Sequence, residues 1–174
     1  HVNSKINPGE DLETIKTEII LSDIDVIQKK LEKGKKKLLE EKQIKILEEK
    51  LSQLNEGKEI FVNDVDEKKF LSSLGLLSIK PKIIVCNVDE GSLANGNTFT
   101  EEVQKKYSYE KVVTICADIE DQIMGLDNNE REVFMKEIGL NKTGLNQLIK
   151  EGYELLNLDT FFTSGPEESR AWTV

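Results

Sequence analysis

Side chains that could recognise a heterocyclic base follow a short apolar run in the middle of the chain. Residues 83–86, Ile-Ile-Val-Cys, lead directly into Asn87, Val88, Asp89 and Glu90. A carboxamide donates and accepts hydrogen bonds and a carboxylate accepts them, so an Asn followed closely by an acidic residue can read the edge of a base. The alternative is a strand that runs into an acidic turn, which is the commoner meaning of so short a motif.

The spacing of Asn87 and Glu90 is close to the Asn-Lys-x-Asp signature with which GTPases bind guanine. In that signature the Asp accepts hydrogen bonds from guanine N1–H and N2–H₂, and adenine presents neither donor there. Here Val88 stands in the Lys position, and Asp89 lies at the unconstrained third position. Glu90 is one methylene longer than Asp, so its carboxylate cannot take the same place without a backbone change. We expect the Asn87 amide to bridge two loops and to meet the purine N7, within a signature that is either damaged or altered in base specificity.

A second apolar run, residues 111–117, ends about 26 residues later in Cys116-Ala117-Asp118. In P-loop GTPases a strand that ends in Ser-Ala-x at this spacing packs its backbone amides against the base, so we predict that Ala117 contacts the base. A loop at 91–97 and a helix around 101–107 separate the two runs, and such strand–helix–strand units favour parallel pairing. Both carboxyl ends then meet at one sheet edge, where ligands bind in these folds.

Before this unit, the spacing of apolar residues predicts an antiparallel helical hairpin. Apolar residues recur every three or four positions over residues 12–31 and again over 44–54, which is typical of amphipathic helices with a coiled-coil seam. Gly34, within a run of lysines, marks the tip between them. Asp64-x-x-Glu67 resembles a capping box and predicts a third helix that carries Phe70, Leu71, Leu74 and Leu77.

After the second strand, the sequence predicts two capped helices and a β-hairpin. Asp127-x-x-Glu130 is another capping box, and Thr143 is a candidate N-cap for the next helix. Residues 160–163 and 170–174 flank a Gly-Pro turn and are typical of the first hairpin of a small β-rich domain. We interpret its aromatic residues as core residues of that domain, because no basic stripe alternates with them as in base-stacking surfaces: Phe161, Phe162 and Trp172.

The charge is distributed unevenly along the chain. Within a net charge of −9, residues 29–50 contribute +4 through nine Lys and five Glu, so the remainder carries −13. An acidic body with one basic segment argues against general coating of nucleic acid, and we expect no DNA partner, but it permits one contact with a polyanion. No apolar run suits a membrane span. Cys86 and Cys116 lie in apolar runs, as expected of small buried residues in a reducing compartment.

Taken together, these residues resemble the Obg-like ATPase family, the YchF proteins. The runs that carry the resemblance include "LLSIKPKIIVCNVDE", "LLNLDTFFTSG" and "RAWTV", and it extends in order over essentially the whole chain. It implies an α/β fold: a partial Ras-like parallel-sheet nucleotide domain, a helical coiled-coil insertion and the start of a β-rich TGS domain. The implied boundaries are 1–21 for part of the nucleotide domain leading into the first helix, 22–79 for the coiled coil, 80–152 for the rest of the nucleotide domain, and 153–174 for the TGS start.

The family's base-recognition motif is Asn-x-x-Glu, which Asn87 and Glu90 match, and its members prefer ATP to GTP. The resemblance therefore implies an ATP hydrolase that uses Mg²⁺, with GTP as the alternative nucleotide. Because no Gly-x-x-x-x-Gly-Lys-Ser/Thr occurs in the sequence, it also implies an internal piece, inactive alone, whose phosphate and metal ligands lie elsewhere. His1 lies in a run similar to the family's His-bearing loop and is the candidate for orienting the attacking water, the alternative being a frayed, inert terminal residue.

The resemblance further implies a cytoplasmic protein that works with the ribosome. The lysines of residues 29–50 are then candidates for a salt-sensitive contact with ribosomal RNA, and otherwise form a solvated face. Two other functions stay open. One is an adaptor that binds the ribosome or a protein through its helical and TGS portions with little catalysis, and the other is a GTPase with a degenerate signature.

Overall fold

The computed structural model describes residues 6–34, 39–62 and 64–174. The chain divides into two compact units, His1–Lys80 and Pro81–Val174. This division lies next to the expected boundary between residues 79 and 80, and the domain assignments themselves stay predictions. His1 and the lysines at 35–37, near the expected hairpin tip, lie outside the described residues.

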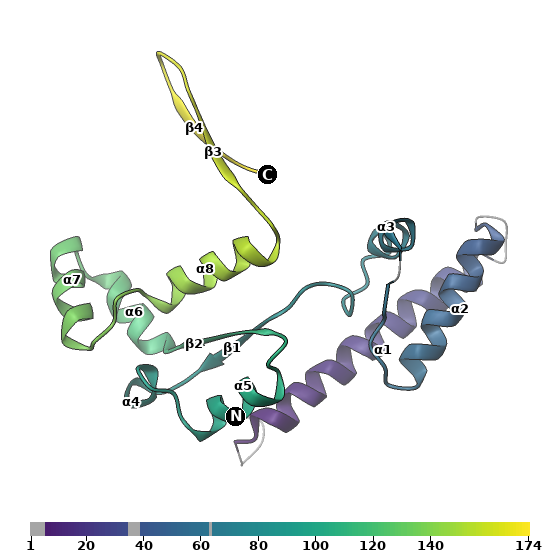
Figure 1. Cartoon of the computed structure of the whole chain (residues 1–174), viewed down its shortest axis with the longest axis horizontal. Coiled ribbons are helices and arrows are strands. Elements are labelled where there is room, and N and C mark those ends of the chain that lie inside the picture. The colour runs from purple at the N-terminus through teal and green to yellow at the C-terminus, as the bar shows by residue number, and fades with distance from the viewer. Residues whose placement is uncertain (1–5, 35–38, 63) are drawn as a thin grey trace. The chain divides into compact units, whose positions relative to one another are not determined.

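The first unit is a helical hairpin followed by a third helix (Figure 1). Helix α1 (Pro8–Gly34) and helix α2 (Glu41–Asn55) pack along each other, and α3 (Val65–Ser73) follows. From Ile20 onward the predicted apolar stripes form the core, because residues three and four apart share one face of a helix, whereas Ile15, at the start of the first stripe, is 54% exposed. The buried members of this core are Ile20, Ile27, Leu31, Leu47, Leu54, Ile60, Leu71 and Leu76.

Helix α3 is shorter than its apolar spacing predicts. The Asp64 side chain accepts hydrogen bonds from two backbone N–H groups of the first turn, which confirms the predicted start of the helix. The helix ends at Ser73, and Gly75 then adopts a φ of +76°, a left-handed conformation that favours glycine and stops helices. Leu77 therefore lies beyond the helix, contrary to the prediction.

A buried carboxylate in the middle of α1 holds the segment that follows α3. Asp23 accepts a hydrogen bond from the backbone N–H of Leu77 at 2.8 Å, and from the N–H and hydroxyl of Ser78 at 2.8 and 2.5 Å. Asp23 is almost completely buried, and a buried carboxylate is tolerated where donors surround it. These bonds fix the backbone shortly before the chain enters the second unit.

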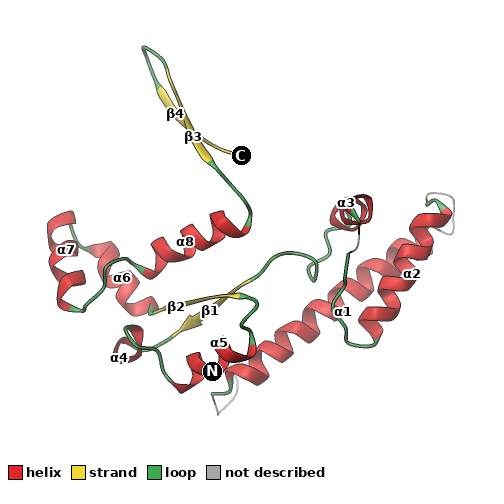
Figure 2. Cartoon of the chain, in the orientation of Figure 1, coloured by secondary structure: helices red, strands yellow, loops and turns green. Residues whose placement is uncertain are grey.

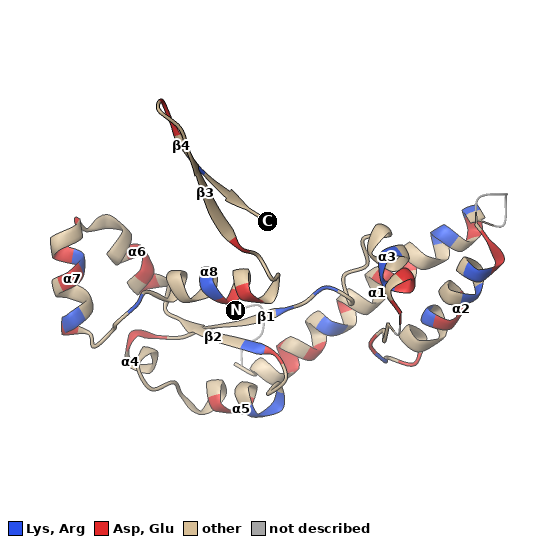
Figure 3. Ribbon diagram, turned by 45° about the horizontal axis from the view of Figure 1, so that its top comes forward, with Lys and Arg blue, Asp and Glu red and all other residues tan. Residues whose placement is uncertain are grey.

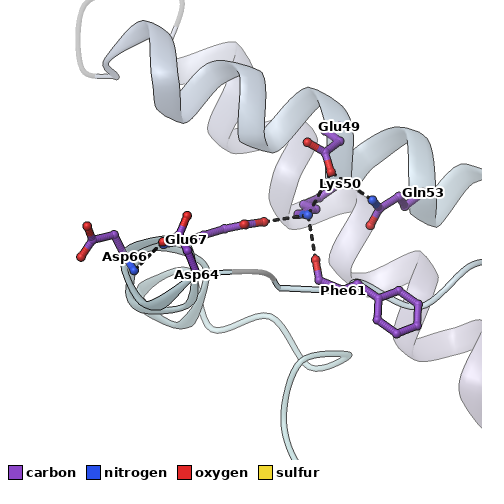
Figure 4. Close-up of polar contacts among 7 residues, drawn as sticks. All are labelled: Glu49, Lys50, Gln53, Phe61, Asp64, Asp66 and Glu67. Atoms are coloured by element: carbon purple, nitrogen blue, oxygen red, sulfur yellow. Dashed lines mark hydrogen bonds and ion pairs between the residues drawn. The ribbon is translucent and has the colours of Figure 1, made fainter.

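Lys50, one of the lysines predicted for contact with RNA, is buried and unavailable to a polyanion (Figure 4). It is 1% exposed, and its Nζ lies 2.7 Å from Glu67 Oε1, 2.7 Å from the Phe61 carbonyl oxygen and 3.1 Å from Glu49 Oε1. Burial disfavours the charged amine, but hydrogen bonds to Glu67 and Glu49 and their charges outweigh it and raise the pKa of Lys50. The prediction is wrong for this residue, which instead ties α2 to α3.

The charges on α1 and α2 are mixed in sign. Figure 3 shows basic and acidic residues interleaved along both helices. Lys29 pairs with Asp25, one turn earlier on α1, whereas Lys33 and Lys45 are exposed. Over the described part of the hairpin, the basic residues therefore do not form a continuous face of one sign.

The second unit is built on two parallel strands, β1 (Ile83–Asn87) and β2 (Lys111–Ile115). Their register pairs Ile83 with Lys111 and Asn87 with Ile115, so the two carboxyl ends lie side by side, as predicted. The chain between the strands forms α4 (Glu90–Leu93) and α5 (Thr98–Lys106). After β2 come α6 (Ala117–Gly125), α7 (Asn128–Glu137) and α8 (Gly144–Leu155). Figure 2 shows this mixture of helices and strands, which confirms the α/β class.

Helices hold the strand pair through β2 and its continuation. Both α5 and α8 contact β2, and Lys111 at its start pairs with Glu151 and Glu154 of α8. A small core lies under α6, where Cys116, Ile119 and Ile123 are buried; side chains packed against it are Leu93, Phe134, Met135, Ile138 and Leu140. The predicted caps of the last two helices are present at Asp127 and Thr143.

Two sequence-based predictions are wrong in this unit, and a third is not tested by the two strands of the hairpin. The second strand ends at Ile115 rather than Ala117, because Ala117 already begins α6. The strand at 83–86, predicted to be buried, is only partly covered, and Val85 is 41% exposed, since β1 pairs with β2 alone among the described residues. The predicted hairpin forms from β3 (Thr160–Ser164) and β4 (Ser169–Thr173), but its aromatic residues are exposed in this chain, and a role as core residues of a larger β-rich domain stays a prediction.

The hairpin aromatics are exposed because two paired strands provide no second layer to bury them. Phe161, Phe162 and Trp172 are 47%, 75% and 45% exposed. Phe161 lies opposite Trp172 in the register, and the indole N–H donates to Thr163 Oγ1 at 2.9 Å. Along the described part of the chain, no helix is both long and apolar enough to cross a membrane.

Candidate base-recognition site

The carboxyl ends of β1 and β2 are joined through Asn87. Asn87 is the last residue of β1, and its Oδ1 accepts a hydrogen bond from the backbone N–H of Ala117 at 3.0 Å. The next residue, Val88, donates its backbone N–H to the carbonyl oxygen of Ile115 at 2.8 Å. The Asn87 side chain therefore bridges the two strand ends, and the Val88 backbone reinforces the bridge.

The bond to Ala117 determines which part of the Asn87 amide is left for a ligand. With Oδ1 engaged, Nδ2 carries the two donors of the side chain. Asn87 is exposed, so these donors can reach a bound molecule. Purine N7 is an acceptor in both adenine and guanine. A donor at this place therefore suits any purine and does not choose between the two bases.

Ala117 supplies one of the backbone donors that a helix leaves unsatisfied at its start. Because Asn87 accepts from this N–H, it is not available to donate to a base, unlike the strand-end amides on which the prediction for Ala117 was based. Ala117 instead holds the Asn87 amide in one orientation. A direct contact between Ala117 and a base stays a prediction. Because the N–H of Ala117 is engaged, such a contact would have to come from other atoms of the residue.

The two carboxylates of the motif are placed differently. Asp89 is the N-cap of α4, and its Oδ1 accepts a hydrogen bond from the Ser92 N–H at 2.8 Å. Glu90 is the exposed first residue of the same helix. Val88, between them and Asn87, is half-buried. Both residues are exposed, but one oxygen of Asp89 is engaged at the helix start, so Glu90 is the stronger candidate for contact with a ligand.

The two segments that meet at the strand ends are acidic. Residues 87–90 and 116–120 contain Asp89, Glu90, Asp118 and Glu120 and no Lys or Arg. Carboxylates accept hydrogen bonds from the amino groups of a base but repel phosphate. These segments therefore suit the base end of a nucleotide and not its phosphates.

The remaining candidate residues concern metal binding, the orientation of water and thiol chemistry. Within the described ranges, no three His, Cys, Asp or Glu side chains gather in a way that could hold a metal ion. His1, the candidate for orienting water, lies outside those ranges. Cys86 and Cys116 are free thiols, Cys116 is buried, and burial raises the pKa of the Cys86 thiol. A thiol whose pKa is raised is a poor nucleophile, so Cys86 fits the packing role predicted for it, and Cys116 fits that role by its burial.

Glu120, for which no role was predicted from the sequence, links α6 to α8. Its Oε1 accepts a hydrogen bond from the Gly144 N–H at 2.6 Å, and its Oε2 accepts one from the Leu145 N–H at 3.3 Å. Two signals were available: an acidic residue early in a segment after the second strand, and a Thr-Gly helix start 24 residues later. Nothing in their spacing pairs them, because the contact depends on the tertiary fold.

The chain is similar over its full length to known proteins, in sequence and in fold. No protein-family model matches it. It is 37% identical over 183 residues to the ribosome-binding ATPase YchF of Escherichia coli O157:H7, covering 100% of this chain and 50% of that protein. It is 35% identical over 186 residues to the protein of the same name from Bacillus subtilis strain 168, covering 99% of this chain and 50% of the relative.

A solved structure, described as that of the Schizosaccharomyces pombe YchF GTPase, matches with a TM-score of 0.85 and 25% identity, covering 100% of this chain and 50% of the other. The chain spans about half the length of the curated relatives it matches. Sequence and fold thus agree from end to end, and they confirm the resemblance inferred from the base-recognition and C-terminal runs. The chain therefore belongs to the YchF family.

Proposed function

We propose that this chain provides the base-recognition side of a purine-nucleotide site, in a protein that hydrolyses ATP to ADP and phosphate and binds the ribosome according to its nucleotide state. The observation that carries the proposal is the 3.0 Å bond between Asn87 and Ala117, which orients a donor at the joined carboxyl ends of two parallel strands. The names of the matched bacterial relatives, ribosome-binding ATPases, support both parts of the proposal.

The choice between ATP and GTP falls to Glu90. The names of the relatives divide on this point, since the bacterial proteins are called ATPases and the Schizosaccharomyces pombe protein a GTPase. Asn87 faces N7, which the two bases share, so it cannot discriminate. An Asp at position 90 could accept from guanine N1–H and N2–H₂, but the longer Glu displaces its carboxylate from that place. A displaced carboxylate no longer accepts the hydrogen bonds from guanine N1–H and N2–H₂. It can accept a hydrogen bond from the adenine 6-amino group instead.

Hydrolysis needs groups that hold the phosphates, and the acidic strand ends do not supply them. We infer that the phosphate and Mg²⁺ ligands come from other parts of the native protein, with His1 orienting the attacking water. Mg²⁺, when bound, neutralises charge on the phosphate oxygens. The residues of this chain bind and orient the base, and so determine where the phosphates are presented.

Equilibrium binding of ATP and GTP to the native full-length protein tests the choice of nucleotide. We expect ATP to bind more tightly, and we expect Glu90→Asp to move the affinity ratio towards GTP, because the shorter carboxylate can reach the guanine donors. GTP binding as tight as ATP binding in the wild type would favour the GTPase alternative. An unchanged ratio in Glu90→Asp would remove Glu90 from base discrimination.

The ribosome is the proposed partner, and the basic residues of the hairpin are the proposed contact. Lys50 is excluded by its burial, which leaves the exposed Lys29, Lys33, Lys42 and Lys45. The lysines at 35–37, which lie outside the described residues, stay candidates from the sequence. A contact with ribosomal RNA phosphates should weaken steeply as salt rises. We expect Lys35→Glu/Lys36→Glu/Lys37→Glu to reduce ribosome binding and its salt dependence. The matched control, with the same charge change on exposed lysines of the second unit, is Lys105→Glu/Lys136→Glu/Lys142→Glu.

A further inference from the structure

Helix α6 begins next to the strand-end bridge without a cap of its own. Its N-cap residue is Cys116, whose side chain makes no capping hydrogen bond, in contrast to Asp127 and Thr143 at the starts of α7 and α8. A helix start normally depends on such a cap to satisfy its first donors. The position of Ala117, the first residue of α6, must therefore be fixed by contacts from outside the helix.

Glu120 provides such a contact one turn into α6. Its two carboxylate oxygens accept from the N–H groups of Gly144 and Leu145, at 2.6 and 3.3 Å. These are the first donors of α8, and Thr143 Oγ1 accepts from the next one, Asn146, at 3.1 Å. A carboxylate is favoured at a helix N-terminus by the helix dipole as well as by the hydrogen bonds. Glu120 therefore locks the first turn of α6 onto the start of α8.

The start of α8 is in turn pressed against the end of β2. A Cβ atom added at Gly144 would lie 2.7 Å from Ile115 Cγ2 and 3.0 Å from Glu120 Oε1, so only glycine allows this approach. Ile115 is the strand residue whose carbonyl accepts the Val88 N–H. Glu120, Gly144 and Ile115 thus form one packed junction directly next to the bridged strand ends.

We propose that Glu120 is a positioning residue for purine binding. It holds the start of α6 on α8, so that the Ala117 N–H stays where it fixes the Asn87 amide with its donors available to a purine. The inference rests on the proposed nucleotide site at these strand ends. Glu120 itself touches no base, and its effect passes through Ala117 and Asn87.

The variant Glu120→Ala removes both bonds to α8, and Asp127→Ala is its matched control. Asp127 also accepts two N–H groups at a helix start, from Asn129 and Glu130 at 2.8 and 2.9 Å, but it serves α7. In the native full-length protein, Glu120→Ala should raise the dissociation constants of ATP and GTP alike, about fivefold, the effect of one hydrogen bond to the N7 that both bases share. Asp127→Ala should leave both constants as they are. Glu120→Gln retains one acceptor for Gly144 and should restore most of the affinity.

Hydrogen exchange at the Ala117 amide gives a second measurement that does not depend on nucleotide. We expect exchange there to be faster in Glu120→Ala than in Asp127→Ala, because only the former frees the start of α6. Equal exchange and equal nucleotide affinities in the two variants would overturn the role of Glu120 alone. A wild-type protein that binds neither ATP nor GTP would instead overturn the proposed function, and the positioning role with it.

Discussion

Asn87 and Ala117, 30 residues apart in the chain, are joined by a 3.0 Å hydrogen bond from a helix-start N–H to a side-chain carbonyl. The bond links the end of β1 to the element that follows β2, across the point where the two parallel strands stop. It gives the amide one orientation before any ligand arrives, which lowers the entropy cost of binding. The two segments it joins contribute carboxylates but no cation, so the arrangement is suited to a base.

The first prediction concerns the donors of Asn87. Asn87→Asp keeps an oxygen for the Ala117 N–H but replaces Nδ2 with a second acceptor, which faces the acceptor N7 of a purine. We expect ATP and GTP to lose affinity alike, by about tenfold or more, because a hydrogen bond becomes a repulsion. Isothermal titration of the native protein measures both constants. Asn129→Ala, at an exposed position on α7, is the control and should bind as wild type.

A second prediction separates the two carboxylates of the motif. Asp89→Ala removes the N-cap of α4 and its bond to the Ser92 N–H, so it should lower the free energy of unfolding by about 1 kcal/mol. The ratio of ATP to GTP affinities should hardly change, since Asp89 is engaged in the helix start. Chemical unfolding and nucleotide binding on the same variant measure the two effects. A large change of the ratio would show that Asp89, and not Glu90 alone, contributes to base discrimination.

The elements that could be predicted from sequence are those set by local patterns. The stripes in α1 and α2 obey helical spacing over many residues, and the caps at Asp127 and Thr143 need only neighbouring backbone donors. The parallel pairing of β1 and β2 followed from a helix between two apolar runs. The position of Asn87 at the strand end was therefore predictable, and so was its capacity to bridge.

What could not be predicted depends on partners distant in sequence. Lys50 lies in a lysine-rich run that looks solvated, and its burial depends on Glu67 in another helix. From sequence, the start of α6 resembles a continuation of β2, because Val and Ile precede it. The helix start is fixed by Glu120, which lies on α6 and accepts a hydrogen bond from the start of α8. Asp23 likewise resembles any acidic residue of an exposed helix face until Ser78 folds back onto it.

A third prediction tests the buried carboxylate of α1. Asp23→Asn would place an amide group among three donors from Leu77 and Ser78 and lose bonds to a charged acceptor. Such bonds contribute about 1.5–3 kcal/mol each, so the free energy of unfolding should fall by roughly 3 kcal/mol or more. Asp25→Asn, two residues along and exposed, should cost less than about 0.5 kcal/mol. Urea unfolding of both variants distinguishes a buried clamp from a general loss of negative charge.

A fourth prediction concerns the ion pair of Lys50 and Glu67. Lys50→Met leaves the Glu67 carboxylate without its cation and should destabilise the helical unit by about 3–5 kcal/mol. The double variant Lys50→Met/Glu67→Leu replaces the pair with apolar side chains and should recover much of that loss. Lys45→Met, exposed on the same helix, is the control. Equal unfolding free energies for Lys50→Met and Lys45→Met would contradict a structural role for the pair.

The last prediction is the pH dependence that this pair creates. Burial works against the charge of Lys50, but Glu67 and Glu49 outweigh it and raise its pKa above the usual 10.5. A raised lysine pKa means that the folded state holds the proton more tightly, so the stabilisation is complete below about pH 10.5 and is lost as pH rises through the folded-state value. The difference in unfolding free energy between wild type and Lys50→Met should therefore be constant near neutrality and shrink in alkali. Other basic groups with raised pKa, such as Lys111, are common to both proteins and cancel in the difference. Urea unfolding of the two proteins in a series of alkaline buffers measures it, and a difference that does not shrink would show that the charge of Lys50 contributes nothing.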